Sequence, residues 1–424
     1  MDDKQIVIIG GGLQGLATAN ALLDRGESVL ILEKEEDTGS ATSFANAGML
    51  TPSQSTPWNS PSDILKILSG IGRKDSPMVL SPSAIPSLLF WGLNFLRNST
   101  KKRFIAISKN GFELASYSRS LTKEIREKES FEYDNNDNGT LKIFHSQEAL
   151  DRSVEITKIL NSSISMKVMD SRDISLVEPA LAPISHQLVG GIYYPEDEIG
   201  DAYKFCKLLE GLVRSKGGRI LVNTDIKKIL IHKGKVNGVI TDRAILQTKR
   251  VVVAAGSWSH ALLKQVGLRL PVRPVKGYSL TLDTAGLDNK PKLAVLDENT
   301  HTAVTPLGNR IRIAGTAEFA GFDDNIHPKR ITYLNKMLES IYPKLYSQLD
   351  LEEGRLWYGF RPMSADGLPF LGKTKIDGLF VNSGQGQSGW TLAMGSASLV
   401  ADLIVNKSTD IDPSPFLASS ALEG

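Results

Sequence analysis

The sequence predicts an α/β fold, and its first 33 residues carry the strongest indication. Residues 5–9 form an apolar, β-branched run typical of a buried strand, and Gly10-Gly11-Gly12-Leu13-Gln14-Gly15 follows at once. Apolar residues at helical spacing predict a helix over 13–25, and a second apolar strand over 28–32 ends at Glu33. A strand, a GxGxxG turn, a helix, a strand and an acid together form the Rossmann-like unit that binds dinucleotides.

Each part of this unit has its own physical role. Gly10 permits the tight turn, Gly12 lets the backbone approach a pyrophosphate, and Gly15 lets the helix pack closely on the strand. The first N–H groups of the helix and its dipole attract the anion. Glu33 lies about 20 residues past the last glycine, where a carboxylate accepts both ribose hydroxyls and repels a 2′-phosphate. The expected ligand is therefore FAD or NAD and not NADP. A glycine-rich turn in an ordinary α/β protein is the alternative, which the complete unit disfavours.

Composition and charge exclude several classes of protein. A chain of 424 residues has room for two or three domains, and its hydrophobic fraction of 41% is ordinary for a globular protein. Its 49 lysines and arginines nearly balance 47 aspartates and glutamates, which argues against a nucleic-acid partner. Cys206 is the single cysteine, so a multi-cysteine metal site is excluded and no metal is expected. The first strand begins too close to Met1 for a cleaved signal peptide, so we expect a cytoplasmic protein.

One uncharged segment, residues 76–96, raises the question of membrane contact. Its second half, residues 88–96, is strongly apolar, and the basic run Lys101-Lys102-Arg103 follows. Three prolines within the segment argue against a spanning helix. We expect a buried helix here. The alternative is an interfacial apolar patch with a basic flank, which would place the protein peripherally on the inner face of a membrane.

The remaining elements alternate between strands and helices, without an internal repeat. Apolar patterns predict further strands over 219–223, 226–232, 236–241, 251–256, 277–282, 302–306, 310–315 and 378–383. Helical spacing predicts helices over 329–341 and from about 390 to 405. The strand 251–256 is wholly apolar and ends in Ala254-Ala255-Gly256. We therefore expect it at the centre of a parallel sheet, with its small residues close to a bound cofactor.

Motifs along nearly the whole chain resemble the D-amino acid oxidase superfamily of FAD-dependent oxidoreductases. The resemblance is strongest to the bacterial D-amino acid dehydrogenases of the small-subunit type. Besides the glycine turn and Glu33, it rests on residues 42–48 (TSFANAG), 195–201 (PEDEIGD), 274–279 (PVKGYS), 310–318 (RIRIAGTAE), 359–367 (GFRPMSADG) and 382–395.

The resemblance implies a Rossmann-like FAD domain and a second, α+β domain whose mixed sheet binds the substrate. The FAD domain is expected from residues 1–53, 145–270 and 355–424, and the substrate domain from 54–144 and 271–354. Non-covalent FAD is expected, because no cysteine lies near Arg361, where some sarcosine-oxidase relatives attach the flavin. The residues expected at the cofactor are Gly10, Gly12, Leu13, Gln14, Gly15, Glu33, Lys34, Ser43, Asn46, Ala47, Gly48, Met49, Ile226, Ala255, Gly256, Gly386, Ser388, Gly389, Trp390 and Thr391.

The resemblance also implies the reaction. A hydride passes from the α-carbon of an amino acid, preferably of D configuration, to flavin N5, and the imine hydrolyses to a keto acid and ammonia. Arg361 matches the arginine that binds the substrate carboxylate in similar enzymes, a task suited to a planar, bidentate guanidinium. A structural arginine paired with Asp366 is the alternative. Arg310 and Arg312 are weaker candidates, because they face one side of a strand that can equally be solvated.

Three further residues are candidate catalytic positions. Tyr278 either projects its hydroxyl into the substrate cleft, as tyrosines do in similar enzymes, or packs in the core. His301 is expected on a strand facing the site, although a lone histidine more often has a surface or core role. Gln385 stands where similar enzymes commonly have a histidine between two glycines, and glutamine does not titrate near neutral pH. This departure keeps open a secondary-amine or imino-acid substrate, such as hydroxyproline, sarcosine or an N-substituted glycine.

Two expectations concern the reduced cofactor. The N–H groups near 389–391, at the start of the last predicted helix, are expected to stabilise negative charge at flavin N1 and O2, with simple helix capping as the alternative. A quinone or another electron-transfer partner is the expected acceptor, because residues 76–96 resemble in position the segment by which bacterial D-amino acid dehydrogenases meet the membrane.

A flavin-binding subunit without chemistry of its own is a further alternative. Arg361 argues against it, since such a subunit needs no carboxylate clamp.

Overall fold

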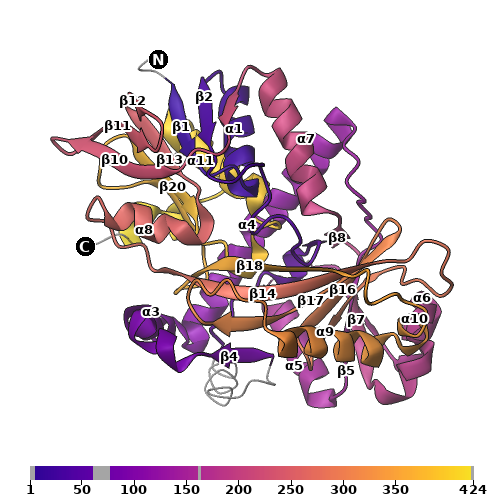
Figure 1. Ribbon diagram of the computed structural model, residues 1–424. Helices are drawn as coiled ribbons and strands as arrows, with labels where there is room; N and C mark the ends of the chain where they lie inside the picture. The colour runs from indigo at the N-terminus through magenta and orange to yellow at the C-terminus, as the bar shows by residue number, and fades with distance from the viewer. Residues whose placement is uncertain (1–4, 61–76, 161–163, 422–424) are drawn as a thin grey trace.

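Two large β-sheets organise the chain, one in the upper half of Figure 1 and one in the lower half. The computed structural model describes residues 5–60, 77–160 and 164–421. Parallel and antiparallel strands alternate with helices, which confirms the predicted α/β class.

The upper sheet has six strands and contains the glycine-turn unit. In spatial order these are β19 (Phe370–Lys373), β20 (Leu379–Ser383), β13 (Arg250–Val253), β1 (Ile6–Ile9), β2 (Val29–Leu32) and β9 (Arg219–Leu221). All neighbours run parallel except β19, which pairs antiparallel with β20. The predicted apolar strand at 251–256 is confirmed as β13 and lies centrally, between β1 and β20. Strands buried on both faces have continuous apolar sequences, and every residue of β1 and β2 is buried.

Helices cover one face of this sheet and a small antiparallel sheet covers the other. Ile6 and Ile8 pack toward the helices, whereas Val7 and Ile9 pack toward the small sheet. The covering elements are α1 (Leu13–Asp24), α7 (Ala202–Ser215) and α11 (Ala393–Val405) on the first face, and β10 (Ile226–His232), β11 (Lys235–Thr241), β12 (Ile245–Leu246) and α8 (Ser259–Lys264) on the second. The upper part of the molecule therefore has three layers (Figure 1).

The lower sheet has nine strands and is mixed. Its main path is β18 (Arg355–Ser364), β14 (Val272–Asp283), β17 (Arg310–Phe319), β16 (Thr302–Leu307), β15 (Ala294–Asp297), β5 (Thr140–Phe144), β7 (Gly190–Tyr194) and β6 (Lys167–Met169), and β4 (Met78–Leu80) pairs with β17. The β15–β5 and β17–β4 pairs are parallel, and the other pairs are antiparallel. The second, mixed sheet expected from the resemblance is therefore present.

Helices pack around the lower sheet and connect it to the upper one. The predicted helix at 329–341 is confirmed as α9 (Pro328–Ile341), which lies under the lower sheet in Figure 1. The remaining elements are α3 (Ile85–Asn98), α4 (Lys101–Glu129), α5 (Gln147–Leu160), α6 (Ser171–Val177), α10 (Pro343–Tyr346), α12 (Ala418–Ala421), the strand pair β3 (Met49–Leu50) and β8 (Glu198–Ile199), and the 3₁₀ helices η1 (Pro52–Gln54), η2 (Pro82–Ala84), η3 (Pro179–Gln187), η4 (Gly256–Trp258), η5 (Gly386–Ser388) and η6 (Ser414–Phe416).

The sheets divide the chain differently from the predicted domain boundaries. The sequence placed 145–270 and 355–424 with the upper domain, but β6, β7 and β18 belong to the lower sheet. β7 pairs with β5, and β18 pairs with β14 over ten residues, so their backbone hydrogen bonds are made inside that sheet. The boundaries at 145 and 355 therefore differ from those of the sheets. Strand pairing over such distances in sequence leaves no local signal at a boundary.

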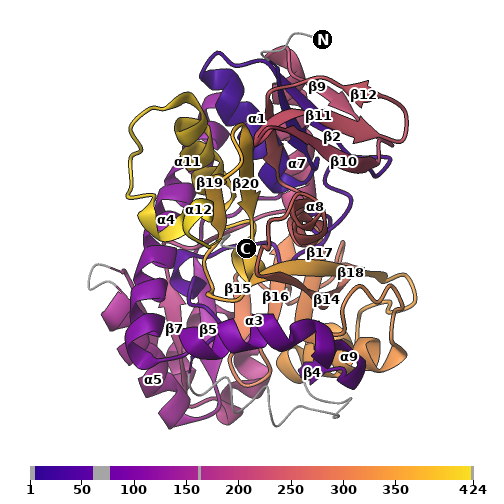
Figure 2. The ribbon, with the colours of Figure 1, turned by 90° about the vertical axis from the view of Figure 1, so that its left-hand side faces the viewer.

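The apolar segment around residue 90 forms a helix that is only half buried. Trp91 and Phe95 of α3 are buried, and Trp91 Nε1 donates a hydrogen bond to the Met363 carbonyl at 3.0 Å. The opposite face exposes large apolar side chains: Leu89 is 60% exposed, Phe90 54%, Leu93 63% and Leu96 53%. The expectation of a buried helix was therefore wrong, since spacing at i, i+4 and i+7 places three leucines on one outward face. Figure 2 shows α3 crossing in front of the lower sheet.

None of the described helices is both long enough and apolar enough to cross a membrane.

Candidate active site

A cavity of about 660 Å³ lies between the two sheets. It adjoins the carboxyl ends of β1, β2 and β13, the edge at which doubly wound sheets bind their ligands. Every residue expected at the cofactor except Gly15 lines this cavity, and so do the four candidate catalytic residues Arg361, Tyr278, Gln385 and His301. The fold thus brings together segments that are separated by more than half the chain.

The glycine turn between β1 and α1 forms one end of the cavity. Gly10 has a φ of +111°, and a Cβ there would lie 2.5 Å from the carbonyl oxygen of Ala254. A Cβ at Gly15 would overlap the Gly10 carbonyl, which explains why this glycine packs helix on strand and does not line the cavity. A Cβ at Gly12 would meet Ser43 Oγ at 3.6 Å and otherwise faces open space. Because Gly12 is the N-cap of α1 and cannot cap it with a side chain, the turn offers room and N–H donors to an anion.

Glu33 follows β2 and is held by two backbone donors. Its Oε2 accepts a hydrogen bond from the Gly11 N–H at 2.6 Å, and its Oε1 accepts one from the Glu35 N–H at 2.9 Å. Burial raises the pKa of this carboxyl group, and the two backbone donors oppose that rise. The neighbouring Lys34 ammonium lies 4.0 Å from the centroid of the Trp258 ring, another side chain of the cavity wall. A carboxylate fixed in the cavity wall suits the ribose hydroxyls of a dinucleotide.

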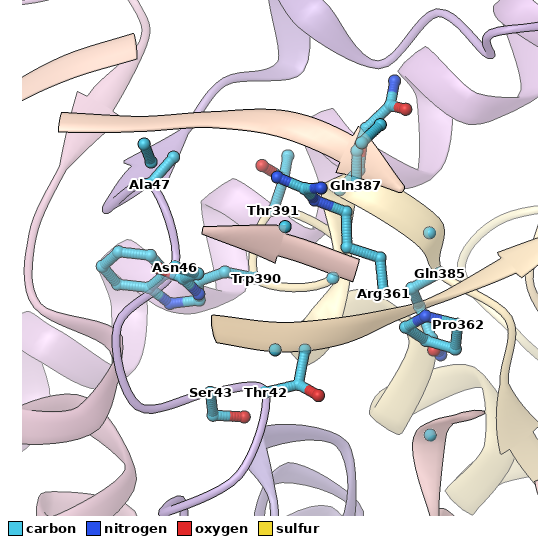
Figure 3. Close-up of a pocket in the computed structure, with 18 of the residues that line it drawn as sticks. Thr42, Ser43, Asn46, Ala47, Arg361, Pro362, Gln385, Gln387, Trp390 and Thr391 are labelled. Atoms are coloured by element: carbon cyan, nitrogen blue, oxygen red, sulfur yellow. The ribbon is translucent and has the colours of Figure 1, made fainter. Parts of the chain in front are cut away.

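The segment 42–48 lies against the lower sheet at the middle of the cavity. Three consecutive carbonyl oxygens of this segment accept hydrogen bonds from side chains on three neighbouring strands. The pairs are Ser279 with Ala45 at 2.7 Å, Arg312 with Asn46 at 3.1 Å and Thr305 with Ala47 at 2.7 Å. Because the C=O and N–H of a trans peptide point in opposite directions, these bonds turn the following N–H groups away from the sheet. The Gly48 N–H donates to Asn46 Oδ1 at 3.0 Å, whereas Asn46 and Ala47 line the cavity with N–H groups that face away from the sheet. Figure 3 shows Asn46 and Ala47 at the cavity edge.

Arg312 supports this segment through Asn46, and both Arg312 and its neighbour on the strand, Arg310, are paired with acids. Arg312 is 3% exposed, and its Nη2 lies 3.3 Å from Asp201 Oδ2. Arg310 Nη2 lies 2.9 Å from the same oxygen and 2.6 Å from Asp134 Oδ2. The ion pairs hold both guanidinium groups within the fold, so neither serves as the carboxylate clamp. Sequence reasoning placed them on one side of a strand but missed their function, because their partners lie more than 100 residues away.

Arg361 extends from β18 into the cavity, away from Pro362 and Gln385 (Figure 3). Its Nη1 donates a hydrogen bond to the carbonyl oxygen of Thr316 at 2.9 Å, and the guanidinium lies 5.9 Å from the centroid of the Trp58 ring. Among the described residues no carboxylate forms an ion pair with it. Burial lowers the pKa of Arg361 to about 10, so the group stays protonated at neutral pH.

The structure does not support the alternative in which Arg361 pairs with Asp366. Asp366 Oδ1 accepts a hydrogen bond from the Leu368 N–H at 3.2 Å, and burial raises the pKa of this carboxyl group to about 6. Arg361 is therefore a protonated guanidinium in a cavity wall without an internal counter-ion among the described residues. An anion entering the cavity would supply the missing charge.

Gln385 is buried at the junction of the upper sheet and α1. Its Nε2 donates to Asn382 Oδ1 at 2.6 Å, and Asn382 Nδ2 donates to Thr18 Oγ1 of α1 at 2.9 Å. The Oε1 atom of Gln385 is buried and has no hydrogen-bond partner among the described residues. The amide is thus oriented by the fold and keeps one acceptor for a bound molecule.

The last helix begins later than the sequence predicted. α11 starts at Ala393 and not near 390, and residues 386–392 form η5 followed by turns. The turns are fixed by hydrogen bonds: Gln14 Nε2 donates to the Gly389 carbonyl at 2.6 Å, and the Thr51 N–H donates to Thr391 Oγ1 at 3.1 Å. The N–H groups expected near the flavin therefore belong to a turn, and the helix dipole begins about one turn further on.

Tyr278 and His301 occupy positions that favour the non-catalytic alternative for each residue, which is core packing for Tyr278 and a surface role for His301. Tyr278 is 3% exposed and packs in the core shared with α9, where its hydroxyl donates to Glu318 Oε2 at 3.0 Å. Glu318 Oε1 in turn accepts from Arg330 Nε at 2.6 Å. His301 is exposed and has a φ of +51° in the turn between β15 and β16, so its expected strand position was wrong. A residue with a left-handed backbone conformation cannot belong to a regular strand, and the pattern of residue types did not indicate that conformation at His301.

Several residues of the cavity wall were not predicted from the sequence. Lys142 on β5, Arg152 on α5 and Glu298 after β15 bring charge to the lower part of the cavity, and Trp258 and Thr316 add an aromatic and a hydroxyl group. These residues lie in ordinary strand, helix and loop patterns. Only their common position in the fold identifies them.

The cavity fits FAD on its own geometry. It contains a turn without side chains for a pyrophosphate, a fixed carboxylate for a ribose, and backbone segments at 42–48 and 386–392 that line its wall. Buried polar atoms without partners among the described residues, including Gln14 Oε1 and Trp390 Nε1, also lie in residues of its wall. Such atoms are costly unless a ligand satisfies them.

Comparison with known proteins agrees with this geometry. Residues 5–403 match the protein family described as FAD dependent oxidoreductase, DAO. The chain is 35% identical over 408 residues to a D-amino acid dehydrogenase of Vibrio atlanticus (strain LGP32), covering 96% of this chain and 97% of that protein. It is 36% identical over 409 residues to a D-amino acid dehydrogenase of Rhizobium johnstonii (strain DSM 114642 / LMG 32736 / 3841), with the same coverage of 96% and 97%.

Solved structures share the whole fold. A glycine oxidase from Geobacillus kaustophilus superposes with a TM-score of 0.77 at 24% identity, covering 99% of this chain and 100% of that chain. An L-proline dehydrogenase from P. horikoshii superposes with a TM-score of 0.75 at 18% identity, covering 98% and 97%. The resemblance predicted from the motifs and the expected cofactor are confirmed, and the chain belongs to the DAO family of FAD-dependent oxidoreductases.

Proposed function

We propose that the protein oxidises the C–N bond of an amino acid, preferably of D configuration, to an imine that hydrolyses to a keto acid and ammonia. The observation that carries the proposal is Arg361, a protonated guanidinium in the wall of the FAD cavity without an internal counter-ion among the described residues. An α-carboxylate is the group that a planar, five-donor guanidinium recognises best. Two relatives that match nearly the whole chain are named D-amino acid dehydrogenases, which supports this substrate class.

The proposal gives each part of the cavity a task. FAD, when bound, supplies the two-electron oxidation. Gly12 and the start of α1 hold its pyrophosphate, Glu33 accepts its ribose hydroxyls, and Arg361 fixes the substrate by its carboxylate. The N–H groups of Asn46 and Ala47 and those of the turn at 389–391 offer neutral donors where negative charge develops on reduction. These donors are already oriented by the fold, so they need no rearrangement during the reaction.

We propose that the FAD is held without a covalent bond. Cys206 lies on α7, is buried and does not line the cavity. Burial raises the pKa of its thiol to about 12, so it is a poor nucleophile at neutral pH. The single cysteine of the chain is therefore both misplaced and unreactive for flavin attachment.

Anaerobic reduction of the bound flavin tests the substrate class. We expect D-alanine and other D-amino acids to bleach the oxidised flavin, and L-alanine to do so far more slowly. Sarcosine, D-proline and hydroxyproline serve as secondary-amine probes. Reduction by these probes alone would favour the secondary-amine alternative that Gln385 keeps open. A flavin that dithionite reduces but no amine reduces would instead identify a subunit without independent chemistry.

We further propose that α3 attaches the protein peripherally to an anionic membrane and that reduced enzyme delivers its electrons to a quinone. The exposed apolar face of α3, formed by Leu89, Phe90, Leu93 and Leu96, is followed by a basic run at 101–103. Apolar side chains enter the acyl boundary, and each lysine or arginine near an anionic surface adds about 1 kcal/mol. Such attachment is modest and sensitive to salt. Electron transfer to a membrane quinone then replaces transfer to oxygen.

Sedimentation with vesicles of phosphatidylglycerol and phosphatidylcholine tests the attachment. We expect the protein to co-sediment at low salt, and the double substitution Leu89→Ser with Leu93→Ser to weaken binding by on the order of tenfold or more. Leu176→Ser is the matched control, because Leu176 is 72% exposed on α6. We also expect a soluble quinone to reoxidise the reduced enzyme faster than air. Rapid peroxide formation without vesicle binding would identify an oxidase whose α3 has another role.

A further inference from the structure

Thr316 interrupts β17 beside the proposed carboxylate clamp. Its φ is +64°, in the left-handed region that β-branched residues rarely adopt. The register of β14 against β17 shifts at this point, since Lys276 pairs with Glu318 but Tyr278 pairs with Gly315. The strand β17 therefore carries one extra residue opposite Gly277, which is a β-bulge. A strained, bulged position in the wall of an active site calls for a functional explanation.

The bulge aims the backbone of Thr316 at Arg361. The carbonyl oxygen of Thr316 accepts the 2.9 Å hydrogen bond from Arg361 Nη1, so it does not simply continue the ladder of β17. Across the pair, Gly277 leaves the space that the guanidinium occupies, because a Cβ there would overlap Arg361. The bulge and the glycine together place Thr316 next to the proposed binding position of the carboxylate.

The side chain of Thr316 is buried yet chemically unused by the protein. Thr316 is 5% exposed and lines the cavity. Its Oγ1 has no hydrogen-bond partner among the described residues. Leaving a buried hydroxyl unpaired is unfavourable, and glycine would adopt the observed φ without strain. Threonine at this position therefore destabilises the folded protein in two ways, through its unpaired hydroxyl and through its left-handed φ. A ligand that bonds to the hydroxyl would explain why threonine is present.

We propose that Thr316 binds the amino group of the substrate and thereby determines specificity for amino acids over other carboxylates. This inference rests on the proposed function, in which Arg361 holds the α-carboxylate. The amino group and the carboxylate are attached to the same α-carbon. When Arg361 holds the carboxylate, the amino group therefore lies close to the residues that contact Arg361, and Thr316 is one of them. Thr316 Oγ1 and the second lone pair of its carbonyl oxygen are acceptors for the amine N–H groups. The two contacts together fix the rotation of the α-carbon.

Ligand binding without turnover tests this proposal. 2-Aminoisobutyrate has the carboxylate and the amine but no α-hydrogen, so it cannot be oxidised by loss of an α-hydride. Isobutyrate has the same carboxylate and no amine. Titration of the holoenzyme, followed by the flavin absorption spectrum, gives a dissociation constant for each ligand. The ratio of the two constants isolates the contribution of the amine.

We expect Thr316→Val to reduce the preference for 2-aminoisobutyrate over isobutyrate by about tenfold, the effect of one lost hydrogen bond. Thr316→Gly, which removes the hydroxyl and relieves the strained φ, is expected to behave like Thr316→Val, whereas Thr316→Ser is expected to retain most of the preference. The affinity for isobutyrate is expected to stay the same in all three variants. An unchanged preference in both Thr316→Val and Thr316→Gly would overturn the assignment.

Arg361→Lys separates this proposal from the one on which it rests. If Arg361 holds the carboxylate, this substitution weakens both ligands by similar factors. If it weakens neither, the proposed carboxylate clamp is wrong, whatever Thr316 does. If it weakens both but the Thr316 variants keep the preference for the amine, the clamp stands and the role of Thr316 is refuted.

Discussion

Gly12→Val is expected to abolish FAD retention while leaving the protein folded. A Cβ at Gly12 meets only Ser43 Oγ at 3.6 Å, so the protein itself tolerates the added carbon. The side chain would instead occupy the space next to the start of α1, where the pyrophosphate is expected to bind. Displacing the anion from several N–H donors costs about 4 kcal/mol or more, which is roughly a thousandfold in dissociation constant.

The flavin absorbance per mole of purified protein measures this effect, and titration with FAD gives the affinity. Gly211→Val is the matched control, because Gly211 lies on α7 and a Cβ there meets nothing within 4 Å. The control is expected to retain FAD as the parent protein does. Equal flavin content in the two variants would show that the pyrophosphate does not bind at the glycine turn.

Arg361→Lys is expected to lose transition-state stabilisation by on the order of 2–4 kcal/mol, mainly as a higher KM with some loss of kcat. Lysine presents a single point charge, so it cannot bond a carboxylate in a bidentate manner and also donate to the Thr316 carbonyl. The FAD content is expected to be unchanged, because the residues assigned to the pyrophosphate and ribose lie on the upper sheet.

Steady-state kinetics with whichever amino acid reduces the flavin fastest measures the loss. Arg355→Lys is the control, since Arg355 lies on the same strand, is exposed and stacks over the Phe44 ring at 4.4 Å. The control is expected to keep kcat/KM within about twofold of the parent, as is usual for surface positions. A parent-like KM in Arg361→Lys, or a substrate that lacks a carboxylate, would exclude the clamp.

Local sequence was sufficient to predict the glycine-turn unit. β1, α1 and β2 have nearly the predicted bounds, because each depends on neighbouring residues: β-branched runs, a glycine with a φ of +111° and an apolar helical stripe. Arg361 and the cofactor residues were identified by resemblance to a family, and nearly all of them line one cavity. Their assignment as functional residues stays a prediction that the substitutions above test.

Predictions that depended on distant partners were less successful. The buried helix expected near residue 90 exposes one face, because the residues that α3 packs against lie on β14, β17 and β18, far along the chain. The boundary at 145 ignored β7, whose pairing with β5 puts residues 190–194 in the lower sheet. His301 was expected on a strand, and its left-handed φ sets it in a turn.

Sequence alone determined the type of fold and the cofactor class, since both follow from short-range patterns of residue type. Tertiary structure decided how the site works. The contact of Arg361 with the Thr316 carbonyl, the three hydrogen bonds that orient 42–48, and the unpaired hydroxyl of Thr316 all depend on which strands are neighbours and in what register. Register is a property of the whole sheet, because a shift of one residue would turn each side chain to the opposite face.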